Sequence, residues 1–142
     1  MRIKGIFKRY AKNQDGVAAV EFGLVSMGFL SLMFGTIEAG HMIWAYNAVR
    51  NATEVASRQA LVEATLTESD LEDIGKNTLD SVMVSSEHFH LTQTTETNGG
   101  VQFNKLDTTY QYTPLLTIML PESLTNVTFN VTVSRPYNWG DE

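Results

Sequence analysis

The sequence predicts an α+β protein in which one long amino-terminal helix, membrane-spanning in its first part, leads into a small head with a short helix and an antiparallel sheet. Three observations predict this class. A basic segment opens the 142-residue chain and precedes an apolar run that is long enough to cross a bilayer. Helical spacing of small and apolar residues then continues to about Leu66. The last part of the chain alternates between apolar and polar residues, as strands do.

The composition allows about one folded domain, and the charge is divided unevenly along the chain. Residues 1–16 carry five basic side chains and one acidic side chain, whereas residues 17–142 carry five basic and fifteen acidic ones. A basic segment ahead of an apolar span keeps the amino terminus cytoplasmic and sends the acidic remainder across the membrane. An acidic head also argues against nucleic-acid binding. Because the chain has no cysteine, it forms no disulfide and no thiolate metal site.

The apolar run extends from Val17 to Ile37 and reads VAAVEFGLVSMGFLSLMFGTI, with Glu21 as its only ionisable side chain. As a helix it is ~31 Å long, which matches the hydrocarbon core of a bilayer. Three fates are compatible with such a run: an uncleaved anchor, a secretory signal cleaved after it, or a leader cleaved before it. The secretory signal fits poorly, because the run is too long and Ile37 stands where the cleavage site needs a small residue.

Glu21 is the unexpected residue in this run. A carboxylate deep in a span costs ~2.5–3.5 kcal/mol on insertion scales, and less near the interface. Cleavage between Gly16 and Val17 gives it a role, since the new amine at Val17 of one chain can neutralise Glu21 of a neighbouring chain. The alternative is an interfacial glutamate tolerated near a helix N-terminus, where the helix dipole stabilises it. The residues alone leave both interpretations open.

The segment from Asp15 to Arg58 resembles the amino-terminal motif of the TadE/TadG-like pseudopilins, minor pilins of the tight-adherence (Flp-type) type IV pilus system. The matching features are Val20-Glu21-Phe22, the run from Phe29 to Gly35, Glu38 with Gly40, and the later ATEVASR.

The resemblance implies a pilin-like fold and cleavage after Gly16 by a prepilin peptidase. Residues 1–16 are then a cytoplasmic leader, 17–38 the transmembrane helix, 39–66 its continuation, and 67–142 a periplasmic α+β head. Val17 becomes the new terminus, and Glu21 with Phe22 becomes the assembly site. The related families often have proline in the middle of the span, whereas this chain reads VSMGFL there.

The function implied is structural. A minor pilin or pseudopilin of this kind helps to initiate, cap or adapt an adhesive pilus from the bacterial inner membrane, and it can become part of the extracellular pilus. Its expected partners are other pilin and pseudopilin subunits, the prepilin peptidase, the inner-membrane assembly platform and membrane lipid. The competing hypothesis is an uncleaved single-pass anchor whose periplasmic domain binds a ligand or a partner protein.

Three residues are expected at the outer membrane interface. Trp44 and Tyr46 follow the run by about two turns, where aromatic side chains commonly lie in the headgroup region. Core packing is an alternative for Tyr46. Glu38 is expected at the same level as a polar interfacial group.

The head is expected to begin where the helix ends. Small and apolar residues recur along the helix at Met42, Ala45, Val49, Ala52, Ala56 and Ala60. This narrow seam lets a sheet approach closely. The segment TESDLEDIGKNTLDSV predicts a second helix, with Ser69 as its N-cap and Glu72 completing a capping box.

The remainder predicts a sheet with one apolar face. Residues 88–96 and 101–107 form two strands joined by a tight turn at Asn98-Gly99-Gly100. Residues 127–134 form another strand, with valines and Phe129 on one face and threonine, asparagine and serine on the other. Residues 110–123 contain two prolines and are expected to form a loop or a short edge strand.

Nothing in the sequence indicates an enzyme. His88 and His90 share one side of a strand, but no third ligand is identifiable, so we expect no metal site. We find no motif for a nucleophile and its base and no glycine-rich phosphate loop, and we therefore expect no cofactor.

Overall fold

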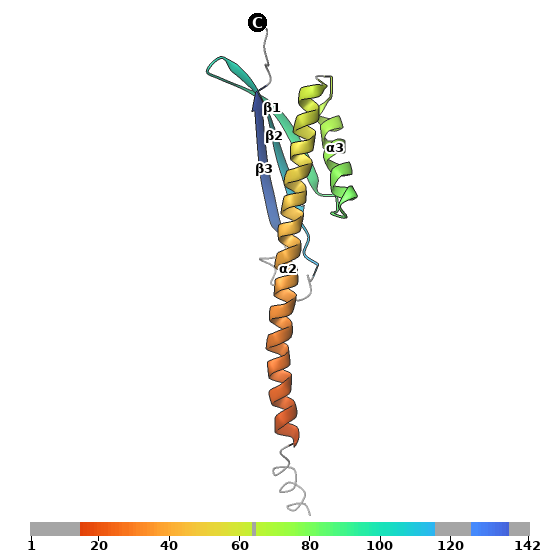
Figure 1. Ribbon diagram of the computed structural model, residues 1–142, viewed down its shortest axis with the longest axis vertical. Helices are drawn as coiled ribbons and strands as arrows, with labels where there is room; N and C mark the ends of the chain where they lie inside the picture. Colours follow the sequence, from red (N-terminus) through yellow and green to blue (C-terminus); the bar gives the residue numbers. More distant parts are fainter. Residues whose placement is uncertain (1–14, 64, 116–125, 137–142) are drawn as a thin grey trace, which may run out of the picture. The chain divides into compact units, whose positions relative to one another are not determined.

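The computed structural model describes residues 15–63, 65–115 and 126–136 (Figure 1). Its elements follow in the order α2 (Asp15–Val62), α3 (Glu68–Ser81), β1 (Phe89–Asn98), β2 (Val101–Tyr112) and β3 (Val127–Pro136). The chain divides into two compact units between Ile37 and Glu38. One long apolar helix, a shorter helix and a three-stranded antiparallel sheet confirm the predicted α+β class.

Helix α2 is uninterrupted over 48 residues, but it ends at Val62 rather than near Leu66 as predicted. The reason lies in the start of α3. Thr67 has an extended backbone, with φ −82° and ψ 166°, because it is the N-cap of α3. An N-cap cannot also continue the preceding helix, so the chain leaves α2 a few residues earlier.

The capping box of α3 forms two residues earlier than predicted. Thr67 Oγ1 accepts from the Asp70 amide at 3.3 Å, and Asp70 Oδ2 accepts from the Thr67 amide at 2.8 Å. The assignment of Ser69 and Glu72 to this role was therefore wrong, since a threonine and an aspartate with the same spacing are available nearer the turn. Hydrogen bonds from the Thr67 side chain and backbone lower the pKa of Asp70.

The hairpin between β1 and β2 is confirmed. Its two turn residues, Gly99 and Gly100, have φ values of 60° and 84°, a conformation that glycine adopts without steric cost. The strands lie in the order β1-β2-β3, and both pairings are antiparallel.

Strand β2 extends further than predicted, and this changes the role of the tyrosines near its end. Tyr110 and Tyr112 were assigned to a loop or an edge strand, but they lie in the central strand and are buried. Both rings stack on Phe129 of β3, at centroid distances of 6.0 and 5.7 Å. Aromatic cross-strand packing therefore extends the strand until Pro114 approaches. The rest of the proline-containing stretch, residues 116–125, lies outside the described residues.

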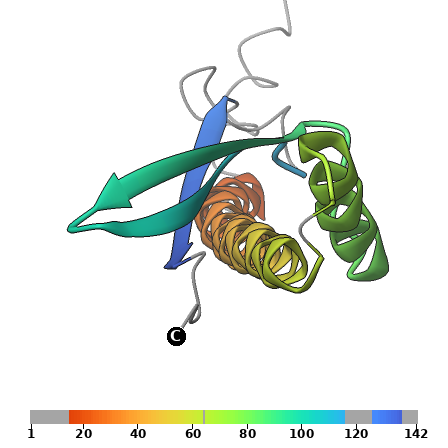
Figure 2. The same cartoon turned by 90° about the horizontal axis from the view of Figure 1, so that it is seen from above.

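One face of the sheet packs on α2, as predicted (Figure 2), and the exposed residues on the other face of β3 are polar. In β3 the alternation is clear: Phe129 and Val131 are buried, whereas Thr128, Asn130 and Thr132 are exposed. The helix contributes the small seam expected from its sequence, and its buried members are Ala45, Val49, Ala52, Ala56 and Ala60. Short side chains here let the sheet lie close to the helix.

Helix α3 contributes Leu71 and Leu79 to the core and contacts β1 closely at Gly75. A Cβ atom on Gly75 would lie 2.5 Å from Cε1 of Phe89, which is fully buried. This close approach explains a glycine in the middle of a helix, where it otherwise costs ~1 kcal/mol relative to alanine.

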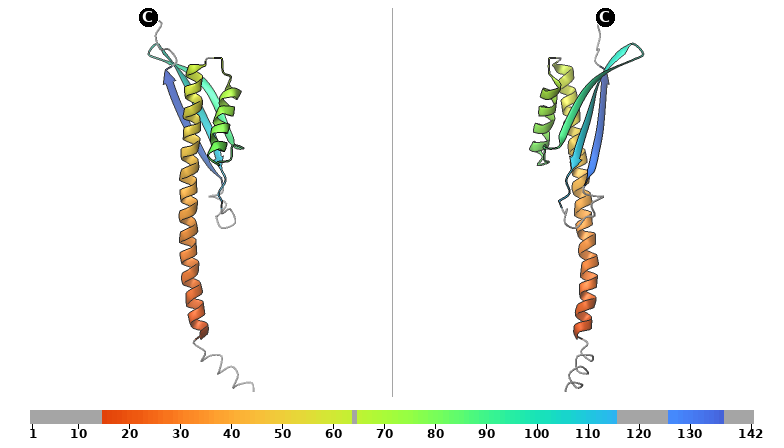
Figure 3. Two further views of the ribbon diagram at one scale, coloured as in Figure 1. Left: turned by 45° about the vertical axis from the view of Figure 1, so that its right-hand side comes forward. Right: turned by 180° about the vertical axis from the view of Figure 1, so that it is seen from behind.

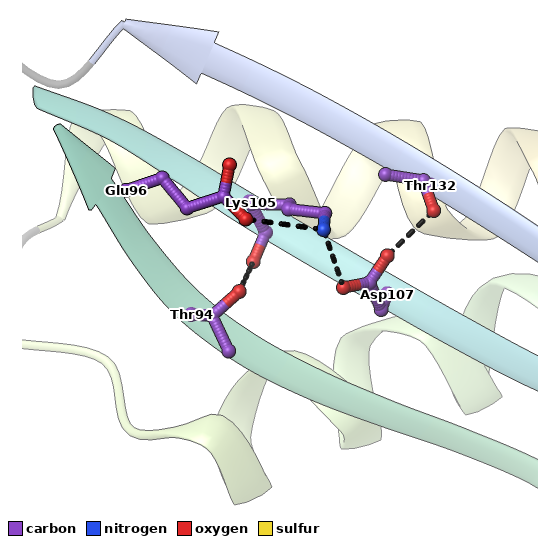
Figure 4. Close-up of polar contacts among 5 residues, drawn as sticks. All are labelled: Thr94, Glu96, Lys105, Asp107 and Thr132. Atoms are coloured by element: carbon purple, nitrogen blue, oxygen red, sulfur yellow. Dashed lines mark hydrogen bonds and ion pairs between the residues drawn. The ribbon is translucent and has the colours of Figure 1, made fainter. Parts of the chain in front are cut away.

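The polar face carries a small cross-strand network (Figure 4). Lys105 Nζ lies 3.2 Å from a carboxylate oxygen of Glu96 and 3.4 Å from one of Asp107, and Thr132 Oγ1 donates to Asp107. The hydrogen bond to Glu96, followed by that to Asp107, raises the pKa of Lys105. Exposed ion pairs of this kind are weakened by water and salt, so these contacts support the strand register and add little stability.

Candidate functional site

The predicted processing and assembly residues lie on the first turns of α2. The described part of α2 starts at Asp15, so Gly16 and Val17 both lie in this helix. Glu21 and Phe22 follow one turn later, and both are exposed, Phe22 by 75%.

The apolar part of α2 is uncovered. The helix Gly16–Val62 is long and apolar enough to cross a membrane, and none of its most apolar stretch is buried by other described residues. Leu24, Val25 and Leu32 are each about 70% exposed. A core helix of a water-soluble domain would bury such side chains, so this segment supports single-pass membrane anchoring.

Glu38 lies directly after this stretch and is 91% removed from solvent, with 9% of its surface exposed. Tyr112 Oη donates to Glu38 Oε1 at 2.5 Å, and the Leu115 amide donates to the same oxygen at 3.3 Å. His41, one turn further along α2, places Nδ1 2.7 Å from Tyr112 Oη. We call Glu38, His41, Tyr112 and Leu115 the Glu38 cluster.

The Glu38 cluster ties the end of β2 to α2. Burial and the hydrogen bond to Glu38 both raise the pKa of Tyr112 strongly, so its hydroxyl stays protonated and remains a donor. Since the hydroxyl donates to Glu38, it is available to accept from His41 Nδ1. The local sequence predicts only an interfacial position for Glu38 and gives no sign of this partner, because Tyr112 is 74 residues away in the chain.

The two aromatic residues predicted at the membrane interface differ from each other. Trp44 is 57% exposed. Tyr46 is 42% exposed and makes an edge-to-face contact with Phe129, with ring centroids 5.5 Å apart. Tyr46 therefore packs against the sheet, which was the alternative for this residue, while the interfacial position of Glu38, Trp44 and Tyr46 stays a prediction.

Over the described residues, no three histidine, aspartate or glutamate side chains converge as metal ligands. His88 is half-buried in the turn before β1, so it does not lie on a strand as predicted, and His90 is exposed on β1. Glu72 on α3 forms an ion pair with Lys76 at 2.5 Å. Burial opposes ionisation of Glu72, but hydrogen bonds from Lys76 and the Leu91 amide outweigh it and leave its pKa lowered.

An uncovered span-length helix that continues into a small α+β head gives the pilin-like fold predicted from the sequence and supports single-pass membrane anchoring. The model of the TadE-like protein family matches residues 16–58, which confirms the resemblance seen in the sequence. The match begins at Gly16 and includes Glu21 and Glu38. It is consistent with a TadE-like pilin of the Tad system, a structural rather than an enzymatic class. No curated protein and no solved structure significantly matches the chain.

Proposed function

We propose that the protein is a minor pilin or pseudopilin of a Tad-type pilus, cleaved after Gly16 and assembled through Glu21. The observation that carries this proposal is the TadE-like match, which begins at Gly16 and includes the uncovered apolar stretch of α2. The head supports a minor role, since the folded part beyond the span is too large to repeat densely in a thin filament.

Processing is the first step of the proposal. The prepilin peptidase would cut between Gly16 and Val17, directly ahead of the apolar run. We expect Gly16→Leu to block cleavage without preventing insertion, because the basic segment and the span are unchanged. Intact mass of the membrane-extracted protein, with and without the peptidase, measures this directly. Recovery of an amino terminus at Val17 from the Gly16→Leu chain would show that the site is misassigned.

Assembly is the second step. After cleavage, the Val17 amine of one subunit would pair with Glu21 of its neighbour, in surroundings where an unpaired charge is costly. Loss of one partner of a buried pair costs ~3–5 kcal/mol, reduced here by water and headgroups near the interface. Glu21→Gln is therefore expected to be inserted and cleaved normally but to lose piliation and crosslinking to other pilins. Glu21→Asp, which keeps the charge, is the matched control, and wild-type piliation in Glu21→Gln cells would show that the carboxylate is merely tolerated.

Orientation is the third element. The five basic residues ahead of the span favour a cytoplasmic amino terminus, a periplasmic head and residence in the bacterial inner membrane. Trp44 and Tyr46, with Glu38, would then lie near the outer interface of that membrane. Protease added to spheroplasts should digest the head, and protection of the head would contradict the orientation.

The partners of the proposal are other pilin and pseudopilin subunits, the prepilin peptidase, the inner-membrane assembly platform and membrane lipid. The competing function is an uncleaved anchor whose head binds a ligand or a partner protein. The same mass measurement separates the two, because only the pilin has Val17 as its amino terminus.

A further inference from the structure

The two edges of the sheet differ in how their backbone groups are satisfied. Along β1, the Leu91 amide donates to Glu72 Oε2 at 3.3 Å and the Gln93 amide donates to Glu68 Oε2 at 2.9 Å. Both carboxylates belong to α3, which lies against β1. They occupy the amides that a further strand would need, so α3 closes this part of the β1 edge.

The strand register shows which amides β3 presents outward. The amides of Leu91 and Gln93 point away from β2. Both strand pairings are antiparallel and uninterrupted, so the direction of each amide in β3 follows from the residue with which it is paired. The outward amides of β3 therefore belong to its even-numbered residues Thr128, Asn130, Thr132 and Ser134. Pro136 occupies the next outward position, where its missing N–H removes no bond to β2.

This outer edge of β3 is uncovered over the described ranges 15–63, 65–115 and 126–136, in which none of the four amides has a hydrogen-bond acceptor. Figure 3 shows β3 on the side of the sheet away from α3. The strand carries no charge from Val127 to Ser134, and Arg135 is its first ionisable residue. Charges are a common means of keeping an edge from pairing, and here they are missing from the length of the strand.

The apolar surface beside this edge is also incompletely covered. Tyr46 packs on Phe129 but is 42% exposed, and Val127 and Val133 of β3 are only half-buried. One more strand would place its inward side chains over these residues. Its outward side chains would continue the polar face formed by Thr128, Asn130 and Thr132.

We propose that the outer edge of β3 binds an extended, uncharged segment of another pilin subunit, which adds to the sheet as a fourth strand. That the segment comes from a pilin subunit rests on the proposed function. That the edge of β3 is open rests on the hydrogen bonds of the structure alone. Backbone hydrogen bonds to the outward amides and carbonyls give affinity, and alternation of apolar and polar side chains in the segment gives selectivity.

A second copy of this chain is a poorer occupant than a different subunit. β3 runs alongside α2 in the head (Figure 1). Antiparallel pairing of two β3 strands would therefore make the two α2 helices run in opposite directions. Chains inserted by the same charge rule have their α2 helices in the same direction, so this self-pairing does not suit a shared membrane.

The first test measures hydrogen exchange of the full chain in detergent micelles. The amides of Asn130 and Thr132 are expected to exchange at least about tenfold faster than those of Leu91 and Gln93, which carboxylates of α3 cover. Slow exchange at Asn130 and Thr132 would mean that the chain covers its own edge, and it would overturn the proposal. Intact mass of the same preparation reports cleavage after Gly16, so failure of the proposed function is seen separately.

The second test uses the absence of cysteine from the chain. A photocrosslinker attached to Thr128→Cys, in membranes of piliated cells, is expected to label an extended segment of a pilin subunit. The matched control is Thr92→Cys, an exposed threonine on β1 beside the edge that α3 closes. Equal labelling from both positions, or labelling only of a second copy of this chain, would overturn the proposal.

The backbone dependence of the crosslink is tested at Asn130. Asn130→Pro removes one outward amide without removing a bond to β2, and we expect it to lower the yield from Thr128→Cys about tenfold. Asn130→Ala keeps the amide and should lower the yield no more than about twofold. Thermal melting of both variants verifies folding. A folded Asn130→Pro chain that crosslinks as well as the parent refutes strand addition.

Discussion

The hydroxyl of Tyr112 offers the sharpest test of how the head is held to α2. Tyr112→Phe keeps the ring and its stacking on Phe129, and it removes only the group that donates to Glu38 and lies 2.7 Å from His41 Nδ1. Tyr112 is 2% exposed and Glu38 is 9% exposed, so water cannot readily replace the lost donor. Glu38 retains the Leu115 amide at 3.3 Å and loses its 2.5 Å contact.

The size of the effect follows from the charge of the acceptor. A hydrogen bond to a charged group contributes ~1.5–3 kcal/mol, and the isosteric ring adds no cavity term. We expect Tyr112→Phe to lower the free energy of unfolding by about 2 kcal/mol. In a domain of about 100 residues this lowers the melting temperature by roughly 8–12 °C.

The assay is thermal unfolding of the full chain in detergent micelles, followed by near-ultraviolet circular dichroism. Tyr46→Phe is the matched control, because the Tyr46 ring also packs on Phe129 but is 42% exposed. It should change the free energy of unfolding by less than about 0.5 kcal/mol. If Tyr112→Phe melts within about 1 °C of the parent, the Glu38 cluster does not stabilise the head and the reasoning fails.

Further predictions concern the caps, the core and the pH dependence. Thr67→Ala should destabilise the head by about 1 kcal/mol through loss of the α3 N-cap, whereas Ser69→Ala should be nearly neutral in the same urea titration. Gly75→Ala should overpack the core and destabilise the head by ~1–3 kcal/mol, while the higher helix propensity of alanine offsets ~1 kcal/mol of this. An increase in melting temperature would contradict the close approach of Gly75 to Phe89. Hydrogen bonds from Thr67 lower the pKa of Asp70 in the folded state. The ionised Asp70 therefore stabilises the head fully above the ordinary aspartate pKa near 3.9, and this stabilisation is lost as the pH falls through the lower pKa of the folded state. In an acid titration, Thr67→Ala should lose less stability than the parent. Burial and the hydrogen bond to Glu38 raise the pKa of Tyr112 in the folded state. The protonated hydroxyl therefore stabilises the head fully below about pH 10, and this stabilisation is lost as the pH rises through the higher pKa of the folded state. Identical alkaline unfolding of the parent and of Tyr112→Phe would argue against this.

Local patterns in the chain predicted most of the fold. The length and composition of Val17–Ile37 predicted an uncovered apolar helix, and the Asn98-Gly99-Gly100 turn predicted the hairpin. Period-two alternation predicted which face of β3 is buried. These features depend on neighbours within a few residues, where backbone sterics and side-chain spacing act directly. The ends of helices and strands were less predictable. Thr67 with Asp70 and Ser69 with Glu72 are both possible capping boxes, and the sequence does not decide which of them starts α3.

The predicted processing residues also came from the sequence alone, because Gly16 and Glu21 stand at the start of an apolar run that needs no tertiary partner. The role of Glu38 required the tertiary structure. Its donors, Tyr112 and the Leu115 amide, are 74 and 77 residues away in the chain, and no local pattern links positions so far apart. The same holds for the β1 edge, which α3 closes with two carboxylates that resembled an ordinary acidic helix start. Folding decides such pairings because a buried charge or an edge amide must find a partner wherever the packed elements bring one within hydrogen-bond distance.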